Sequence, residues 1–266
     1  SLALAEYRSR QVSNVEYKLS FTIPEKKEEA INSKLILNLD ISDLSAPLYL
    51  DFKEGSDHLK SVVVNGSKND IVHSDEHLII AADNLEIGNN KIEIEFIMGE
   101  LSLNRNDEYL YTLLVPDRAR TLFPCFDQPN LKAKYTLTIT APNDWQVLCG
   151  APKKNTSENG NLTTHQFGQT ENISTYLFSF VAGKFQSASE NPEGFDMTLL
   201  YRENDSSKIA LSLPKIFELH NQSVKFLEGY TAYNFPFQKL DYAAIPGFQY
   251  GGMEHVGAIQ YREGAL

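Results

Sequence analysis

The sequence contains little cysteine, methionine or tryptophan, and it has no long apolar run. Of its 266 residues, two are cysteine, three are methionine and one is tryptophan. Cys125 and Cys149 are too few for a disulfide framework or a thiolate metal site, and they can form either one disulfide bond or two free buried thiols. No apolar stretch approaches the roughly 20 residues that a membrane-spanning helix needs, so no transmembrane segment is expected.

The chain is also short of positive charge. Its 24 Lys and Arg residues against 35 Asp and Glu residues give a formal net charge of −11. An acidic surface repels phosphate backbones, so nucleic acid is not expected as a partner. Hydrophobic residues make up 42% of the chain and charged residues 22%. This balance is typical of a folded globular protein and argues against a disordered one.

Apolar and polar residues alternate along most of the first 200 residues. A period of two places every second side chain on one face of a strand. The alternating segments are 17–23, 35–41, 48–52, 62–64, 92–96, 135–139 and 176–180. Many of them end at turn-forming residues, as at Asn65-Gly66. Many short, half-buried strands predict antiparallel sheets packed face to face, as in a β-sandwich or a saddle-shaped relative of one.

The pattern changes near residue 200, where apolar residues begin to recur at intervals of three and four. This stripe comprises Leu213, Phe217, His220, Val224 and Leu227. It predicts an amphipathic helix, with Ser212 as its N-cap and Pro214 in its first turn. A short strand over 240–245 follows. We therefore predict a β-rich domain over residues 1–200 and a mixed α/β segment over residues 201–266.

Residues 73–77 spell His-Ser-Asp-Glu-His, which has the spacing of an inverted zinc-peptidase motif. That motif holds zinc only on a helix, where residues four apart share a face. Here the three central residues lie between two apparent strands. We therefore expect a hairpin in which His73 and His77 flank a tight turn, with no third metal ligand.

Cys125 lies in a run, residues 117–129, that allows two interpretations. A nucleophilic cysteine needs a nearby base that lowers the pKa of its thiol. No histidine is close to Cys125 in the sequence, although the fold can bring one close in space. Alternatively, Arg120 and Asp127 form a pair that fixes a bend between sheets. We favour this structural role.

The segment Gly251-Gly252-Met253-Glu254-His255 combines backbone freedom with two polar side chains. Adjacent glycines allow an extended peptide to approach and to bond with main-chain groups. A carboxylate at position 254 can pair with a cation, and an imidazole at position 255 can donate or accept a hydrogen bond. The same residues also suit a glycine turn with two solvated side chains. Spacing alone does not decide between these interpretations.

Two segments resemble signatures of the aminopeptidase N family, whose members are zinc metallo-aminopeptidases of the gluzincin clan. The first is residues 119–135, with Arg120, Phe123-Pro124-Cys125-Phe126-Asp127 and Pro129. The second is Gly251-Gly252-Met253-Glu254, which matches four of five positions of the family's Gly-x-Met-Glu-Asn motif. The flanking stretches 240–246 and 257–263 match as well. Both signatures occur in the family's order, so the resemblance covers essentially the whole chain.

This resemblance implies a mainly β protein, with a saddle-shaped β-sandwich domain followed by the first part of a thermolysin-like α/β catalytic domain. It implies that Glu254 binds the free α-ammonium group of a peptide substrate. The stretch from Gly251 to Met253 is then expected to lie along the substrate backbone, with Met253 lining the first side-chain pocket. His255 stands where the family has Asn, and Leu113 stands where many members have Gln or Glu. Substrate contacts at these two positions are therefore expected to differ from those of the family.

The family's zinc ligands come from a His-Glu-x-x-His helix and a later glutamate, and this sequence contains no such motif. We therefore expect no catalytic or metal-ligating residue within the 266 residues. One zinc ion is expected in the intact enzyme, bound by the protein's own C-terminal catalytic portion.

The resemblance thus predicts the N-terminal part of a zinc aminopeptidase that acts on peptides with a free α-amine and is inactive by itself. The alternative is a non-catalytic β-sandwich module that binds a protein or a glycan. A start at Ser1 suggests processing, and similar acidic family members are often exported. A location in the cell envelope or periplasm is therefore expected.

Overall fold

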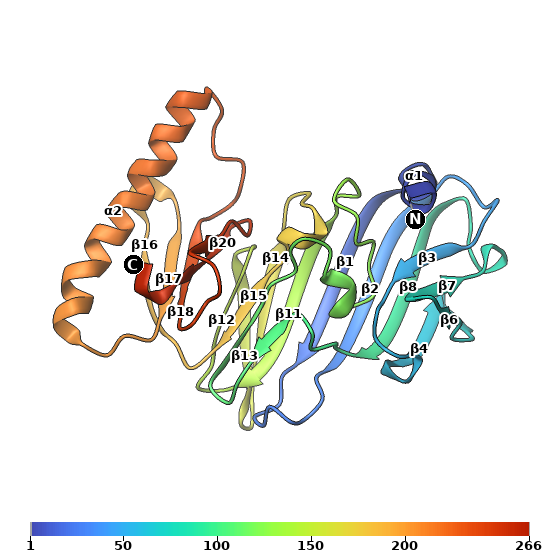
Figure 1. The fold of residues 1–266 in the computed structure, drawn as a ribbon, viewed down its shortest axis with the longest axis horizontal. Helices are drawn as coiled ribbons and strands as arrows, with labels where there is room; N and C mark the ends of the chain where they lie inside the picture. Colours follow the sequence, from blue (N-terminus) through green and yellow to red (C-terminus); the bar gives the residue numbers. More distant parts are fainter. Residues whose placement is uncertain (1, 266) are drawn as a thin grey trace.

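The computed structural model describes residues 2–265, and within them it forms four β-sheets and two α-helices (Figure 1). The expected mainly β class is confirmed. The helices are α1 (Leu2–Gln11) and α2 (Ser206–Thr231). Short 3₁₀ turns lie at Ser56–His58, Ala82–Asn84, Ala119–Thr121, Thr175–Leu177, Pro192–Gly194 and Glu263–Ala265. Within the described chain, no helix has the length and apolar character that crossing a bilayer requires.

The largest sheet has eight strands and one buried face. In order across the sheet, its strands are β13 (Lys153–Asn159), β14 (Leu162–Gln169), β11 (Lys134–Pro142), β1 (Val12–Thr22), β2 (Asn32–Ile41), β8 (Gly88–Ile97), β4 (Leu59–Val64) and β5 (Ser67–Asn69). Buried residues such as Tyr17, Leu19 and Phe21 alternate with more exposed ones along the central strands. The alternation seen in the sequence is therefore the division between the core face and the solvent face.

One pair of strands in this sheet departs from the expected antiparallel arrangement. β1 and β11 run parallel, with Tyr17 opposite Tyr135 and Ile139 opposite Phe21. The expectation of purely antiparallel sheets is wrong at this pair. Parallel neighbours need a long crossover connection, and the chain forms β2 to β10 between these two strands.

Two smaller sheets form the second layer. The first contains β3 (Leu48–Asp51), β7 (His77–Ile80) and β6 (His73–Ser74), and the second contains β12 (Gln146–Cys149), β15 (Phe180–Gly183), β10 (Tyr109–Thr112) and β9 (Leu103–Arg105). Leu50 and Phe180 from these sheets share one hydrophobic cluster with Tyr17 and Leu35 of the large sheet. The predicted face-to-face packing of sheets is confirmed by this shared core.

The fourth sheet, which has five strands, lies beyond the second layer. Its order is β16 (Gln186–Glu190), β17 (Met197–Tyr201), β18 (Asp241–Ile245), β20 (Ala258–Arg262) and β19 (Gly252–Met253). The three central strands are parallel, and both outer strands are antiparallel to their neighbours. One face of this sheet packs on the four-stranded sheet, and the other face packs on α2. Figure 1 shows α2 lying across this sheet, at the end of the molecule away from α1.

α2 begins earlier than the sequence pattern predicts. The Asp205 side chain caps it by accepting hydrogen bonds from the backbone N–H groups of Ser207 and Lys208, at 2.9 and 3.3 Å. The predicted N-cap at Ser212 is therefore wrong, and Pro214 lies inside the helix instead of in its first turn. A proline there removes one backbone hydrogen bond.

Two further differences involve short elements. Residues 176–180 do not form a single strand, because Thr175–Leu177 is a 3₁₀ turn and β15 starts at Phe180. α1 was not predicted, since its only two buried residues, Arg8 and Gln11, are polar. Cys125 and Cys149 are both buried and free, so the alternative of a disulfide bond does not hold.

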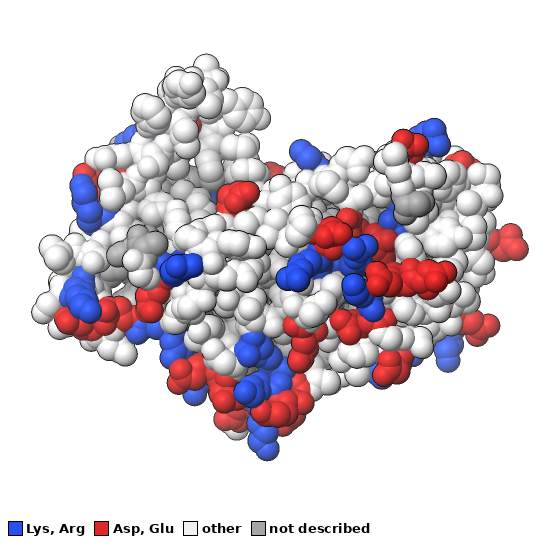
Figure 2. All heavy atoms as spheres, viewed as in Figure 1, with Lys and Arg blue, Asp and Glu red and all other residues white. Residues whose placement is uncertain are grey.

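The outer face of α2 carries large apolar side chains that are exposed and belong to none of the three hydrophobic clusters. Phe226 and Tyr230 stack on each other and remain 69% and 79% exposed. Leu211 and Leu219 are exposed on the same helix. Figure 2 shows that the projection formed by the end of α2, at the upper left, is nearly free of charged side chains on the face drawn. Exposed apolar surface of this extent is typical of an interaction site.

A buried ion pair fixes α1 to the sheets. The Arg8 guanidinium donates two hydrogen bonds, of 2.8 and 2.7 Å, to the Asp51 carboxylate, and both side chains are buried. Asp51 also accepts a hydrogen bond from the backbone N–H of Asp127 at 2.9 Å. The pair thus ties α1 to β3 and to the loop that precedes β11.

We predict that Arg8→Met lowers the free energy of unfolding by about 3–5 kcal/mol, because the Asp51 carboxylate stays buried without its cation. Arg10→Met, on the exposed side of the same helix, should change it by less than about 0.5 kcal/mol. Urea unfolding of both variants checks this. Equal effects of the two substitutions would contradict it.

Candidate functional site

The His73–His77 segment forms the expected hairpin. β6 and β7 are joined by Asp75 and Glu76, which both have positive φ angles. The Nε2 atom of His73 lies 2.9 Å from the carbonyl oxygen of Phe52, whereas that of His77 lies 3.2 Å from the Asp51 carboxylate. The two imidazoles therefore have separate partners. Over residues 2–265, no group of three or more His, Cys, Asp or Glu side chains is arranged to hold a metal ion.

Cys125 is part of the core. Its backbone exchanges two hydrogen bonds with Asp51, of 2.7 and 3.0 Å, and its side chain is fully buried. Burial raises the pKa of its thiol well above the ordinary value, which disfavours the reactive thiolate. These observations support the structural interpretation of this run.

The expected pairing of Arg120 with Asp127 takes a different form. The Arg120 guanidinium donates to Asp117 at 2.8 Å, and the Asp127 carboxylate accepts from the backbone N–H of Arg120 at 3.1 Å. Asp117 is exposed, so the charged pair remains in solvent. Burial raises the pKa of Asp127 to about 6.

The Gly251–Glu254 segment lies at the edge of the five-stranded sheet. β19 is the outermost strand, and its only partner among the described residues is β20. Met253 is buried in the cluster between the sheets, whereas Gly251, Gly252 and Glu254 are exposed. Within the part of the chain that the structure describes, no group hydrogen-bonds or ion-pairs with the Glu254 carboxylate. The segment thus combines an open strand edge with a free negative charge.

Several hydrogen bonds hold the loop that leads into this segment. The Arg262 side chain donates to the carbonyl oxygens of Phe248 and Gln249 at 2.9 and 2.8 Å, and its backbone N–H donates to Gly251 at 3.0 Å. The Tyr109 hydroxyl, from the four-stranded sheet, donates to the carbonyl oxygen of Pro246 at 3.1 Å. The loop is therefore fixed from both sheets.

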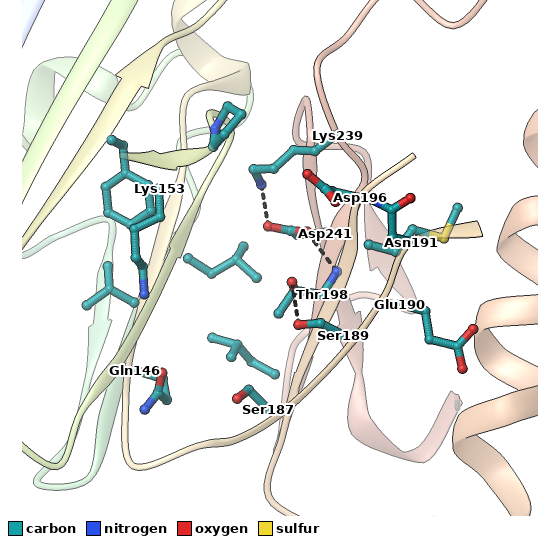
Figure 3. A pocket seen from close by; sticks show the side chains of 16 residues that line it. Gln146, Lys153, Ser187, Ser189, Glu190, Asn191, Asp196, Thr198, Lys239 and Asp241 are labelled. Carbon is teal, nitrogen blue, oxygen red and sulfur yellow. Dashed lines mark hydrogen bonds and ion pairs between the residues drawn. The ribbon is translucent and has the colours of Figure 1, made fainter. Parts of the chain in front are cut away.

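A buried lysine holds the other end of the segment. Lys239 is 4% exposed, and its Nζ atom donates to the carbonyl oxygens of Cys149 and Gly257, at 2.7 and 2.8 Å, and to the Asp241 carboxylate at 2.5 Å. Its three N–H donors therefore have three acceptors. Asp241 accepts a further bond from the backbone N–H of Thr198 at 2.8 Å (Figure 3). Burial raises the pKa of Asp241.

Gly257 is required where the segment meets the four-stranded sheet. Its φ angle is +65°, and a side chain there would collide with the carbonyl oxygen of Gly150. Close backbone approach of this kind needs glycine. Val256, one residue earlier, packs into the large core cluster of the β-layers.

A cavity of about 510 Å³ lies beside this junction (Figure 3). Lys153 of β13, together with Glu190 and Asp196 from the other side, lines it with both signs of charge. None of residues 251–255 lines it. The cavity is therefore separate from the segment that carries Glu254.

Residues 14–177 match the peptidase M1 N-terminal domain family. This chain belongs to the peptidase M1 family.

Three relatives give the extent of the similarity. The tricorn protease-interacting factor F2 of Thermoplasma volcanium is 31% identical over 166 residues, which are 62% of this chain and 20% of that protein. Human glutamyl aminopeptidase is 35% identical over 153 residues, 56% of this chain and 15% of its own length. Aminopeptidase N of Streptomyces lividans is 32% identical over 158 residues, 58% of this chain and 18% of its own. The chain thus spans a fifth or less of these curated relatives.

In this M1 chain, the residue at position 113 lies close in space to the Gly251–Glu254 segment. Leu113 follows β10 and shares one hydrophobic cluster with Met253 and Phe248. Leu113 is 2% exposed, so it belongs to an apolar wall between the two sheets. Roles for Leu113 and Met253 in substrate binding stay predictions.

His255 is placed differently from its exposed neighbour Glu254. It is 1% exposed, and neither ring nitrogen has a hydrogen-bond partner among the described residues. Burial lowers its pKa to about 3, so the ring is neutral at physiological pH. Its role at a substrate also stays a prediction.

Sequence reasoning missed Lys239 and Arg262 as residues that hold the Gly251–His255 segment in place. The signal for Lys239 is a Lys-x-Asp triplet placed directly before a wholly buried strand, β18. Lys and Asp are rarely buried unless they pair with an opposite charge, so a Lys and an Asp beside a buried strand are expected to form an ion pair with a structural or functional role. Arg262 has no comparable signal, because its acceptors are backbone carbonyls of a loop.

We predict that Lys239→Met destabilises the chain by about 3–5 kcal/mol, because the buried Asp241 carboxylate loses its cation. Lys184→Met is the control, since Lys184 forms an exposed 3.4 Å pair with Asp144 and such pairs contribute about 0–1 kcal/mol. Urea unfolding monitored by fluorescence measures both. A Lys239 variant as stable as the Lys184 variant would disprove the role of this junction.

We predict that His255 makes the chain sensitive to acid. Its pKa is about 3 in the fold and near 6.5 in an unfolded chain, so the unfolded chain binds more protons between these pH values. The free energy of unfolding therefore has its full contribution from the neutral His255 ring above pH 6.5. It falls below that pH, by up to about 1.4 kcal/mol per pH unit. His255→Asn should flatten the unfolding free energy between pH 6 and pH 4. Parallel curves for variant and parent would refute this.

Proposed function

We propose that this chain is the N-terminal part of an M1 aminopeptidase and that Glu254 binds the free α-ammonium group of a peptide. The observation that supports this most directly is the exposed Glu254 carboxylate, which has no partner within residues 2–265 and directly follows an open edge strand. The names of two relatives, glutamyl aminopeptidase and aminopeptidase N, agree with the proposal that the chain is part of an aminopeptidase.

The chemistry follows from these two features. An ammonium group carries three N–H donors and a full charge, and hydrogen bonds between charged groups are about twice as strong as neutral ones. An extended peptide can add to the free edge of β19 through main-chain hydrogen bonds. With the amine at Glu254, the peptide enters in one register only. The first peptide bond is then always presented at the same place, which is what an exopeptidase requires.

The proposal also covers the domains of the intact enzyme. The β-layers would form the saddle-shaped N-terminal domain, and the five-stranded sheet with α2 would begin a thermolysin-like catalytic domain. The described residues do not fit zinc, since they contain no cluster of suitable ligands. Zinc and the groups that act with it would therefore come from the protein's own C-terminal portion. The exposed apolar face of α2 supports the packing of a further portion on it.

In the full-length protein, Glu254→Gln should lower kcat/KM for aminoacyl-nitroanilides by about 10- to 150-fold, because a charge-assisted hydrogen bond contributes about 1.5–3 kcal/mol. Glu158→Gln, at an exposed position on β13, is the matched control and should leave kcat/KM unchanged. N-acetylated substrates should not be cleaved by the parent enzyme.

Each other outcome has a definite meaning. Unchanged kcat/KM in Glu254→Gln would remove Glu254 from the site. Absence of any hydrolysis by the full-length protein would contradict the aminopeptidase proposal and favour a non-catalytic binding module. The 266-residue chain alone should show no turnover, and turnover free of contaminating peptidase would contradict its dependence on the C-terminal portion.

A further inference from the structure

An aromatic ring supports the glycine strand from the side of α2. Gly252 pairs with Tyr261 across β19 and β20. A Cβ atom on Gly252 would lie 3.0 and 3.2 Å from two carbons of the Tyr261 ring. The ring therefore occupies the space that a side chain at position 252 would need. Met253, the next residue, points to the opposite face and into the cluster between the sheets.

The Tyr261 hydroxyl is held by His220 of α2. The Nδ1 atom of His220 lies 2.8 Å from the carbonyl oxygen of Ile216, and its Nε2 atom lies 3.1 Å from the Tyr261 hydroxyl. A carbonyl oxygen can only accept, so Nδ1 carries the proton in this bond. In the neutral ring, Nε2 is then the acceptor and the tyrosine donates. Burial lowers the pKa of His220, which favours this neutral form.

A second tyrosine fixes the plane of the His220 ring. His220 stacks on Tyr242 with ring centroids 4.1 Å apart and planes 19° apart. Tyr242 is fully buried in β18, at the centre of the sheet. The His220 ring also meets Tyr261 edge to face at 5.6 Å. The imidazole thus has a defined position, orientation and tautomer.

We propose that His220 and Tyr261 are positioning residues for substrate binding, which hold β19 and the Glu254 carboxylate that follows it in the geometry that receives a peptide N-terminus. This rests on the proposed function. The line of contacts runs from the α2 backbone through His220 and the Tyr261 ring to Gly252, two residues before Glu254. Neither side chain touches the substrate in this arrangement. They act by restricting the strand to which the substrate binds.

The test is a double-substitution cycle in the full-length protein, with Tyr261→Phe, His220→Phe and the double variant. Tyr261→Phe keeps the ring under Gly252 but leaves His220 without its donor, and His220→Phe keeps an aromatic ring on Tyr242 but leaves the hydroxyl without its acceptor. Each single substitution should raise KM for aminoacyl-nitroanilides about threefold to tenfold, with kcat changed less than about twofold. The double variant should have a KM close to that of the more affected single variant, because both substitutions break the same hydrogen bond and their effects are therefore not additive.

A matched control and a second readout make the result specific. Tyr49→Phe, on β3 of the three-stranded sheet, should leave KM unchanged. Hydrogen exchange of the Met253 amide should be faster in both single variants than in the parent. If the full-length enzyme is active and needs Glu254, but both single variants keep the parent's KM and the parent's exchange rate at Met253, the positioning role of His220 and Tyr261 is wrong while the proposed function still holds. A parent enzyme with no aminopeptidase activity would overturn the proposed function instead.

Discussion

The buried ammonium group of Lys239 is the interaction on which the arrangement of this chain depends. It joins Asp241 of the five-stranded sheet and the loop that follows Glu254 to Cys149 of β12 in the second β-layer, which is 90 positions away in the sequence. A buried charge is tolerated only when its hydrogen bonds are all satisfied. The three acceptors around Lys239 therefore have to be in place together, which fixes the two sheets and the Gly251–His255 segment relative to each other. Gly257 and Gly150 contribute the close backbone contact that makes this possible.

Around this junction, the glycine segment is held on every side except the one that faces outward. Arg262 and Tyr109 hold the loop that enters it, and Lys239 holds the loop that leaves it. The Tyr261 ring supports it from the side of α2. The free edge of β19 and the Glu254 carboxylate therefore face outward from a rigid support. Rigid placement of a charged group reduces the entropy lost when a ligand binds.

Much of the fold could be predicted from the sequence, because half-buried strands leave a period of two that needs no knowledge of their partners. β1, β2, β8 and β11 all follow this rule. The parallel pairing of β1 with β11 could not be predicted, since it depends on the path of the chain between them. α1 was missed because polar contacts with residues distant in sequence hold it in place. They include the Arg8–Asp51 ion pair, which joins residues 43 positions apart, and the hydrogen bonds of Gln11 to the carbonyl oxygens of Asp43 and Ala46. The motif residues were found by resemblance, whereas the side chains that hold them were found only in the structure.

A crystal structure of the full-length protein with a non-hydrolysable dipeptide analogue that has a free amine tests the central claim most directly. The account predicts that the amine nitrogen lies about 2.7–2.9 Å from a carboxylate oxygen of Glu254, which is the distance of a charge-assisted hydrogen bond, with the analogue extended along β19. An amine bound elsewhere, with Glu254 still facing solvent, would contradict the account.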